Sequence, residues 1–306
     1  MNYGIMIETN KSIEKLVSSL KSSQTEGINE FWVSQIFGYD SLTLIGILSQ
    51  HIKDVSFGTA VVPIQPKHPF ALALQALTVS SSMSQKLTLG IGLSHQMVIE
   101  NIYGLSFLKP AEQMQEYLQI LNPVLRGEGV NFSGEHYRVS YMGKVEISTG
   151  NRPSVIVAAL GTKMLEIAGK LADGTATWMT GLNTVRDHIV PNISNSAEKS
   201  GKNAPEIIVG LPICVTENIE QAKQMASNLF AIYGSLPSYR SMLDKEKASG
   251  PEDVAIIGSQ QQVSETLLSL PNYGATKFIG GVFGNAKEIE NTISLIAQIN
   301  ANKIRA

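Results

Sequence analysis

Residues 55–92 read VSFGTAVVPIQPKHPFALALQALTVSSSMSQKLTLGIG, and this stretch decides the fold. Its first part, Val55–Val62, is an apolar run of strand length. Pro69 then opens a segment, residues 70–83, in which apolar residues recur at helical spacing, and a second apolar run follows at Leu87–Ile91. Strands that are apolar throughout, joined by a helix, are typical of a parallel sheet buried on both faces.

The same strand and helix unit recurs over the rest of the chain. Further expected strands lie at residues 3–7, 31–33, 155–157, 175–179, 207–214 and 277–279, and helical spacing follows each of them. Eight such alternations predict an α/β fold, a (β/α)₈ TIM barrel with insertions that covers residues 1–306 as a single domain. A doubly wound open sheet is the alternative fold.

Two segments interrupt the alternation. Residues 129–150 alternate between apolar and polar side chains and are punctuated by glycine, which predicts a hairpin inserted on the outside of the barrel. Residues 233–258 contain Pro237, Pro251 and many polar side chains, so we expect a loop excursion there, followed by a short helix at Gln262–Leu270.

The composition excludes several classes of partner. The chain has 306 residues, a net charge of −2 and 16% charged residues, so it has no basic field that would gather nucleic acid or anionic lipid. No apolar run is long enough to cross a membrane, and the N-terminus does not resemble a signal peptide. A lone cysteine, Cys214, fits a reducing cytoplasm, where we expect the protein to be located.

Active sites of α/β barrels lie at the C-terminal ends of the strands, where this chain carries small residues. Such residues allow the backbone to approach a flat ligand closely. Gly90-Ile91-Gly92 begins like a dinucleotide-binding motif, but His95 occupies the third glycine position, so that interpretation is weak. Trp178 could stack on a ring or serve as a buried aromatic plug. The candidate segments are Ser34-Gln35-Ile36, Ala60-Val61, Gly92-Leu93-Ser94-His95, Ala159-Leu160-Gly161-Thr162 and Trp178.

Several titratable and capping side chains each allow a functional and a structural interpretation. Thr162 could cap the helix that follows it and leave backbone amides free for a phosphate group, or it could be an ordinary cap. His95 could line the site or be a hydrogen-bonded loop residue. Glu112 and Glu116 share a helix face that we expect to be solvated. No two histidines have the spacing of metal ligands, so we expect no catalytic metal.

An ordered series of segments resembles the luciferase-like monooxygenase superfamily, and within it the F420-dependent oxidoreductases. The resemblance spans nearly the whole chain. It implies a (β/α)₈ barrel that holds F420 or FMN at its mouth. The segments are FWVSQIFGYDSLTLI, FGTAVVPIQPKHPFALALQALT, LTLGIGLSH, LKPAEQMQEYL, ALGTKMLEIAGKLADGTATWMTG and GLPICVTEN.

The resemblance also implies roles for single positions. Ala60-Val61 matches a pair joined by a cis peptide bond behind the cofactor ring. The loops at Gly92–His95 and Ala159–Thr162 match the segments that line the ring and the phosphate, respectively. Gln35 stands where many deazaflavin enzymes have an acidic residue, and Ile36 where they have a functional histidine. We therefore take His95 and Gln35 as the catalytic candidates. The cofactor-binding candidates are Ser34, Ala60, Val61, Gly92, Leu93, Ser94, Ala159, Leu160, Gly161, Thr162 and Trp178.

These expectations define an oxidoreductase that transfers a hydride between F420 and a small organic substrate. The alternatives are a monooxygenase that uses reduced FMN and oxygen, and a flavin-binding protein without catalysis. The resemblance also implies a homodimer formed through outer helices and a flavin or F420 reductase as partner. We further expect that enlarging Gly92 or Gly161 weakens cofactor binding and leaves folding unchanged.

Overall fold

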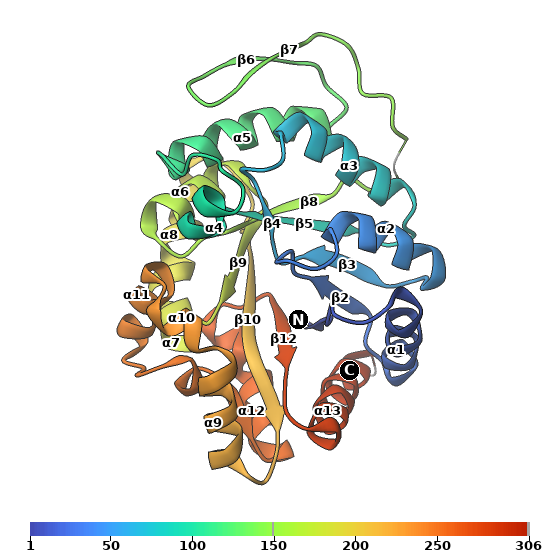
Figure 1. The fold of residues 1–306 in the computed structure, drawn as a ribbon, viewed down its shortest axis with the longest axis vertical. Helices are drawn as coiled ribbons and strands as arrows, with labels where there is room; N and C mark the ends of the chain where they lie inside the picture. Colours follow the sequence, from blue (N-terminus) through green and yellow to red (C-terminus); the bar gives the residue numbers. More distant parts are fainter. Residues whose placement is uncertain (149, 305–306) are drawn as a thin grey trace.

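The computed structural model describes residues 1–148 and 150–304. Eight parallel strands form a closed barrel, because β9 pairs with β10 as well as with β8. The helices surround the barrel in Figure 1, so the closed barrel is confirmed and the open sheet is not. In barrel order the strands are β1 (Asn2–Met6), β2 (Glu30–Val33), β3 (Ser56–Thr59), β5 (Leu87–Gly92), β8 (Ser154–Ala158), β9 (Gly174–Trp178), β10 (Glu206–Val215) and β12 (Lys277–Val282).

The third strand is interrupted, contrary to the continuous strand expected at residues 55–62. After β3 the chain leaves the ladder and returns as β4 (Val62–Pro63), which pairs with the end of β5. This path requires a glycine opposite it, since a Cβ atom on Gly90 would lie 2.0 Å from the Thr59 carbonyl oxygen. The peptide bond between Ala60 and Val61 is cis, as predicted.

The outer layer consists of helices, some of which begin at a side-chain cap. The Asp40 carboxylate accepts a hydrogen bond from the Thr43 amide at the start of α2, and His68 Nδ1 accepts one from the Phe70 amide at the start of α3. No helix of the described residues is long and apolar enough to cross a membrane. The helices of this layer are α1 (Ile13–Glu26), α2 (Ser41–His51), α3 (Pro69–Ser81), α4 (Gln96–Asn101), α5 (Pro110–Leu125), α6 (Thr162–Leu171), α7 (Leu182–Thr184), α8 (Val190–Lys199), α9 (Ile219–Leu229), α12 (Gln260–Ser269) and α13 (Ala286–Ile304).

Side chains fill the interior of the barrel. A buried layer at mid-height includes Trp32, Ile156, Ala176, Ile208 and Ile279, and Met6 and Ala60 pack against it. Because this layer closes the barrel, a ligand can bind only above it, at the C-terminal mouth. At the opposite end the buried carboxylate of Glu30 lies 3.7 Å from the Lys277 ammonium and accepts a hydrogen bond from the Trp32 indole.

The expected hairpin is present as β6 (Val130–Ser133) and β7 (Arg138–Tyr141), which pair antiparallel and project beyond α3 and α5 in Figure 1. Glu116 of α5 fastens it, since its carboxylate accepts hydrogen bonds from the backbone amides of residues 135, 136 and 137. The expectation of a merely solvated face was therefore wrong for Glu116, which has a structural role.

The expected loop excursion at residues 233–258 is largely helical, so that prediction was wrong. The segment includes most of α10 (Ala231–Ser235), all of α11 (Pro237–Glu246), a 3₁₀ turn at Pro251–Asp253 and β11 (Ile256–Gly258). Pro237 occupies the first turn of α11, where a missing amide hydrogen costs nothing. The sequence interpretation treated this proline as a helix breaker and so missed the helix.

Candidate active site

Small side chains form one side of the barrel mouth. Gly92, at the end of β5, faces Val61 and Ala158, and a Cβ atom added there would lie 2.6 Å from Val61 Cγ2 and 3.3 Å from Ala158 Cβ. The glycine is therefore required by packing within the protein itself. Contrary to the expectation from the sequence, we therefore predict that enlarging Gly92 affects folding as well as cofactor binding.

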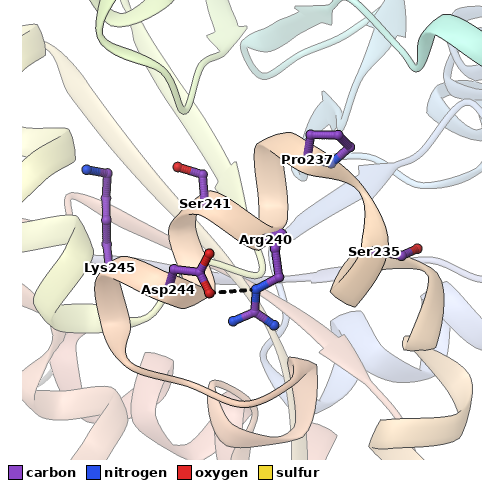
Figure 2. A pocket seen from close by; sticks show the side chains of 6 residues that line it. All are labelled: Ser235, Pro237, Arg240, Ser241, Asp244 and Lys245. Atoms are coloured by element: carbon purple, nitrogen blue, oxygen red, sulfur yellow. Dashed lines mark hydrogen bonds and ion pairs between the residues drawn. The ribbon is translucent and has the colours of Figure 1, made fainter.

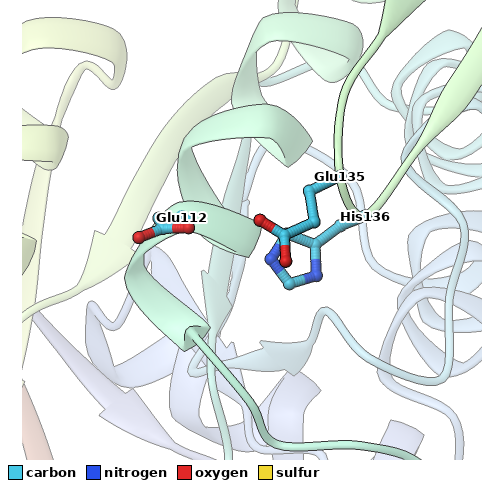
Figure 3. Close-up of side chains that lie close together, drawn as sticks. All are labelled: Glu112, Glu135 and His136. Atoms are coloured by element: carbon cyan, nitrogen blue, oxygen red, sulfur yellow. The ribbon is translucent and has the colours of Figure 1, made fainter.

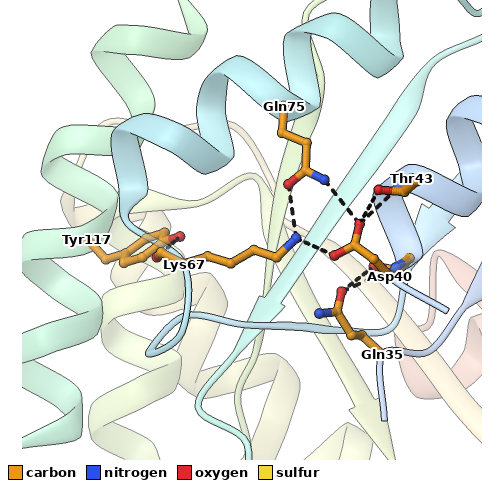
Figure 4. Close-up of polar contacts among 7 residues, drawn as sticks. Gln35, Asp40, Thr43, Lys67, Gln75 and Tyr117 are labelled. Carbon is orange, nitrogen blue, oxygen red and sulfur yellow. Dashed lines mark hydrogen bonds and ion pairs between the residues drawn. The ribbon is translucent and has the colours of Figure 1, made fainter. Parts of the chain in front are cut away.

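The residues after β2 belong to a polar network shown in Figure 4. The Gln35 side-chain oxygen accepts hydrogen bonds from the backbone amide and hydroxyl of Ser41, at 3.3 and 2.9 Å. Because both partners are donors, the amide oxygen must face Ser41, and the NH₂ group remains to donate elsewhere. Asp40 lies beside them and is held by Lys67 at 2.5 Å.

The hydrogen bonds from Ser41 to Gln35 limit the chemistry that the Gln35 side chain can perform. An NH₂ group donates hydrogen bonds but cannot accept a proton, so Gln35 is suited to hydrogen bonding with a ligand oxygen and not to general base catalysis. Ser34 is half-buried beside it. Ile36 is 61% exposed on the rim, so it offers an apolar contact where the resemblance implied a histidine.

His95 follows β5 at the first cap position of α4. Its ring makes no capping hydrogen bond, is half-buried, and lies 6.1 Å from the Tyr239 ring. Burial lowers the pKa of the His95 imidazole below its usual 6.5, so the ring is neutral at neutral pH. Ser94 before it has a left-handed φ of 58°, a conformation that is unusual for serine and concentrates near functional sites.

The loop before α6 differs from the sequence interpretation in one respect. Gly161 occupies the cap position with extended backbone, and Thr162 is the first helical residue, so Thr162 does not cap the helix. The helix has no side-chain cap, which leaves its first amides available to an anion. Gly161, Thr162 and Lys163 are exposed, and a Cβ atom on Gly161 would meet nothing within 4 Å.

The neighbouring residues support this loop. The Leu160 carbonyl oxygen lies 2.8 Å from His188 Nε2, which holds the loop against the helix that follows β9. Ala159 is buried and its carbonyl oxygen accepts a hydrogen bond from the Thr175 hydroxyl, so it supports the loop from within. The sequence interpretation missed Lys163, which is exposed in the first turn of α6.

Aromatic side chains form a second side of the mouth. We use the name aromatic row for His95, Tyr239, Tyr233 and Trp178, whose consecutive ring centroids lie 6.1, 4.9 and 6.2 Å apart. The two tyrosines come from α10 and α11. Sequence reasoning missed them because that segment was expected to be a loop, although Tyr239, Met242 and Leu243 show helical spacing after Pro237.

Gln65 is a further residue that sequence reasoning did not identify. It follows β4 and is half-buried, and both polar atoms of its side chain are buried without a hydrogen-bond partner. An amide with no partner at all costs free energy in the folded state, so it points to a ligand or an ordered water. Nothing in the sequence around Gln65 distinguishes it from an ordinary loop residue.

The described residues hold one group that could ligate a metal, namely Glu112, Glu135 and His136 between α5 and the hairpin (Figure 3). Lys109 already neutralises the carboxylates, with its ammonium 2.8 Å from Glu135 and 3.5 Å from Glu112. The group lies outside the barrel and is exposed at both glutamates. We therefore assign it no catalytic role.

An open groove of about 690 Å³ lies along α11, lined by Ser235, Pro237, Arg240, Ser241, Asp244 and Lys245 (Figure 2). Arg240 pairs with Asp244 at 2.8 Å inside it. None of the residues that line this groove lies at the C-terminal end of a barrel strand. We therefore place the candidate active site at the strand ends and not in the groove.

The model of the family described as luciferase-like monooxygenase matches residues 1–277 of the chain. The chain belongs to this family. The 5,10-methylenetetrahydromethanopterin reductase of Archaeoglobus fulgidus is 24% identical over 248 residues, covering 78% of this chain and 72% of the relative. A Mycobacterium tuberculosis protein, provisionally described as a coenzyme F420-dependent oxidoreductase, is 27% identical over 165 residues, which are 50% of this chain and 48% of that protein.

Several solved structures share the fold of this chain. The F420-dependent tetrahydromethanopterin reductase of Methanopyrus kandleri superimposes with a TM-score of 0.79 at 16% identity, covering 97% of both chains. The oxygenating constituent of the 3,6-diketocamphane monooxygenase of Pseudomonas putida, solved with FMN, has a TM-score of 0.78 at 16% identity, covering 99% of this chain and 98% of the other. Enzymes with either cofactor therefore share this barrel.

Proposed function

We propose that this luciferase-like enzyme transfers a hydride between coenzyme F420 and a small organic substrate. The observation that carries the proposal is the pairing of an uncapped, exposed α6 N-terminus with a mouth wall of small residues on β3, β5 and β8. The first suits a phosphate group and the second suits a flat ring. Relatives named as F420-dependent support the deazaflavin as the cofactor.

The protein's own contribution is to bind, orient and exclude water. The α6 amides and Lys163 would hold the phosphate, and Val61, Gly92 and Ala158 would lie against the ring. When bound, a 5-deazaflavin supplies the carbon that gives or takes the hydride, so the chain needs no strong nucleophile. When the substrate is oxidised, the neutral imidazole of His95 can accept the proton that leaves the substrate hydroxyl, and in the reverse direction the imidazolium can return that proton to the carbonyl oxygen.

Monooxygenation with reduced FMN is the second candidate function, and one observation favours it. Gln35 and Ile36 stand where the resemblance implies an acidic residue and a histidine in deazaflavin enzymes. Such an enzyme would depend on a flavin reductase as partner. A flavin-binding protein without catalysis is the weakest proposal, because those proteins are reduced barrels and all eight strands are present here.

The cofactor can be identified directly. We expect protein purified from a host that makes both FMN and F420 to carry F420, detected by mass and absorbance after denaturation. Recovery of FMN alone would favour the monooxygenase function instead.

We also propose that residues 1–306 act as one domain and form a homodimer through outer helices. A single dimeric species in sedimentation would support this proposal, and a monomer at micromolar concentration would refute it.

A further inference from the structure

The aromatic row is a continuous surface built by elements far apart in the sequence. The Trp178 ring lies over two positions without side chains, because a Cβ atom on Gly281 or Gly210 would lie 2.5 or 3.1 Å from it. Tyr233 and Tyr239 meet edge to face at 77°, and Tyr233 meets Trp178 at 73°. All four members of the row are half-buried, so each keeps an accessible edge.

The polar atoms of the row are neutral. Burial raises the pKa of both tyrosine hydroxyls and lowers the pKa of the His95 imidazole, so none of the three is charged near neutral pH. The Trp178 Nε1 atom is buried and makes no hydrogen bond of ordinary geometry, although the indole is near enough to the Tyr233 hydroxyl to oppose part of the rise in its pKa. The row offers uncharged hydrogen-bonding groups only.

Two charged side chains of α11, Arg240 and Glu246, are already engaged. Arg240 of α11 pairs with Asp244 and donates to the carbonyl oxygens of residues 248 and 249. Glu246 accepts four hydrogen bonds from Asn183 and Thr184. Neither side chain has a free charge to offer a ligand. An ion placed against the row would therefore lose hydration without gaining a partner.

The rim beside the row is apolar as well. Exposed hydrophobic side chains follow β2 and β5, the strands that carry the Gln35 and His95 loops. A polar, charged substrate would gain little from such a rim, whereas an apolar one would bury surface against it. The side chains are Ile36, Phe37, Met97, Ile102, Tyr103, Leu105 and Leu108.

From these observations we propose that the aromatic row is the substrate wall of this enzyme and that it selects an uncharged, planar, conjugated carbonyl compound. The substrate's ring packs against Tyr239 and Tyr233, and its carbonyl oxygen accepts a hydrogen bond from the row or from the Gln35 NH₂ group. The inference rests on the proposed function, because it places this substrate beside a redox cofactor in the same mouth.

Three matched probes test the inference by calorimetric titration of the protein saturated with F420, and again with FMN. Acetylnaphthalene is planar and uncharged, naphthoate has the same rings with a negative charge, and acetyldecalin is uncharged but not planar. We expect acetylnaphthalene to bind about tenfold more tightly than either of the others, since a tenfold ratio corresponds to about 1.4 kcal/mol and aromatic pairing supplies about that amount.

Variants locate the binding surface. Tyr239→Leu should weaken acetylnaphthalene binding about tenfold, whereas Tyr239→Phe, which keeps the ring, should bind within about threefold of wild type. Tyr273→Leu is the matched control, because Tyr273 is another half-buried tyrosine but precedes β12 at the opposite end of the barrel. Thermal unfolding is followed for each variant, and Tyr233→Leu replaces Tyr239→Leu if the latter does not fold.

The outcomes separate this inference from the proposed function. Naphthoate or acetyldecalin binding as tightly as acetylnaphthalene, or unchanged binding in folded Tyr239→Leu and Tyr233→Leu proteins, overturns the inference. If the enzyme does not turn over F420 but the FMN-saturated protein still binds acetylnaphthalene more tightly than the other two probes, only the proposed cofactor is overturned. Turnover of F420 with charged or saturated substrates overturns only the substrate class.

Discussion

Replacing Gly161 by aspartate should make the protein more stable and its cofactor binding weaker. Gly161 caps α6 with extended backbone, makes no side-chain cap and has open space around its missing Cβ atom. An aspartate there can accept hydrogen bonds from the free amides and interact with the helix dipole, which together stabilise the fold by about 1 kcal/mol. The expected rise in Tm is about 1 to 3 °C.

The same carboxylate would occupy the position proposed for the cofactor phosphate. Losing charge-assisted hydrogen bonds to the α6 amides, each of which contributes about 1.5 to 3 kcal/mol, should weaken F420 binding by about 100-fold. Fluorescence titration gives the affinity and differential scanning calorimetry gives the stability.

Two controls isolate the phosphate in this experiment. Gly161→Ala adds a methyl group without an acceptor and should change both quantities little. The phosphate-free deazaflavin riboside should bind wild type and Gly161→Asp equally. Unchanged F420 binding in the aspartate variant would refute the placement of the phosphate at α6, and a fall in Tm would refute the cap geometry.

Four further predictions follow from single residues. Gly92→Val should lower the Tm even without cofactor, because its side chain would collide with Val61; an unchanged Tm would show that the wall can yield. Gln65→Leu should stabilise the apo protein by about 1 to 3 kcal/mol and weaken cofactor or substrate binding, and equal binding would assign the buried amide to water. Burial raises the pKa of Glu30 above 4.5, so the stability that its protonation contributes is complete below pH 4.5 and is lost as the pH rises through the raised value. Glu30→Gln should therefore become more stable relative to wild type in urea unfolding as the pH rises above 4.5, and parallel curves would exclude Glu30 as the titrating group. With an alcohol as substrate and oxidised F420 as hydride acceptor, turnover should fall on the acid side with a midpoint below pH 6.5, because the neutral imidazole must accept the hydroxyl proton and burial lowers the pKa of His95; His95→Asn should lose that limb, and a midpoint above 6.5 would contradict its role.

The barrel could be predicted because its signal is local and repeated. Apolar runs such as Leu87–Gly92 and the helical spacing behind Pro69 recur along the chain, and all eight expected strands are present. The break in the third strand could not be read from periodicity, because it depends on Gly90 of the next strand approaching the Thr59 carbonyl. The resemblance identified the cis bond at Ala60-Val61; the local pattern favoured a regular strand.

The site was predicted less completely for a related reason. The ends of the strands identify which residues reach the mouth, so Gln35, His95 and Gly161 could be predicted from the sequence as site residues. Contacts between segments that are distant in the sequence could not be predicted in this way. Ser41 turning the Gln35 amide outward, and Tyr239 meeting His95, both depend on how separate helices pack against the barrel.

Anaerobic turnover tests the central claim most directly. Reduced F420 is mixed with the enzyme and acetylnaphthalene in the absence of oxygen, and cofactor oxidation and alcohol formation are followed together. Hydride transfer from cofactor to carbonyl predicts one alcohol for each F420 oxidised, with no requirement for oxygen. Failure to oxidise reduced F420 with any carbonyl substrate, together with oxygen-dependent product formation from reduced FMN, would contradict the account.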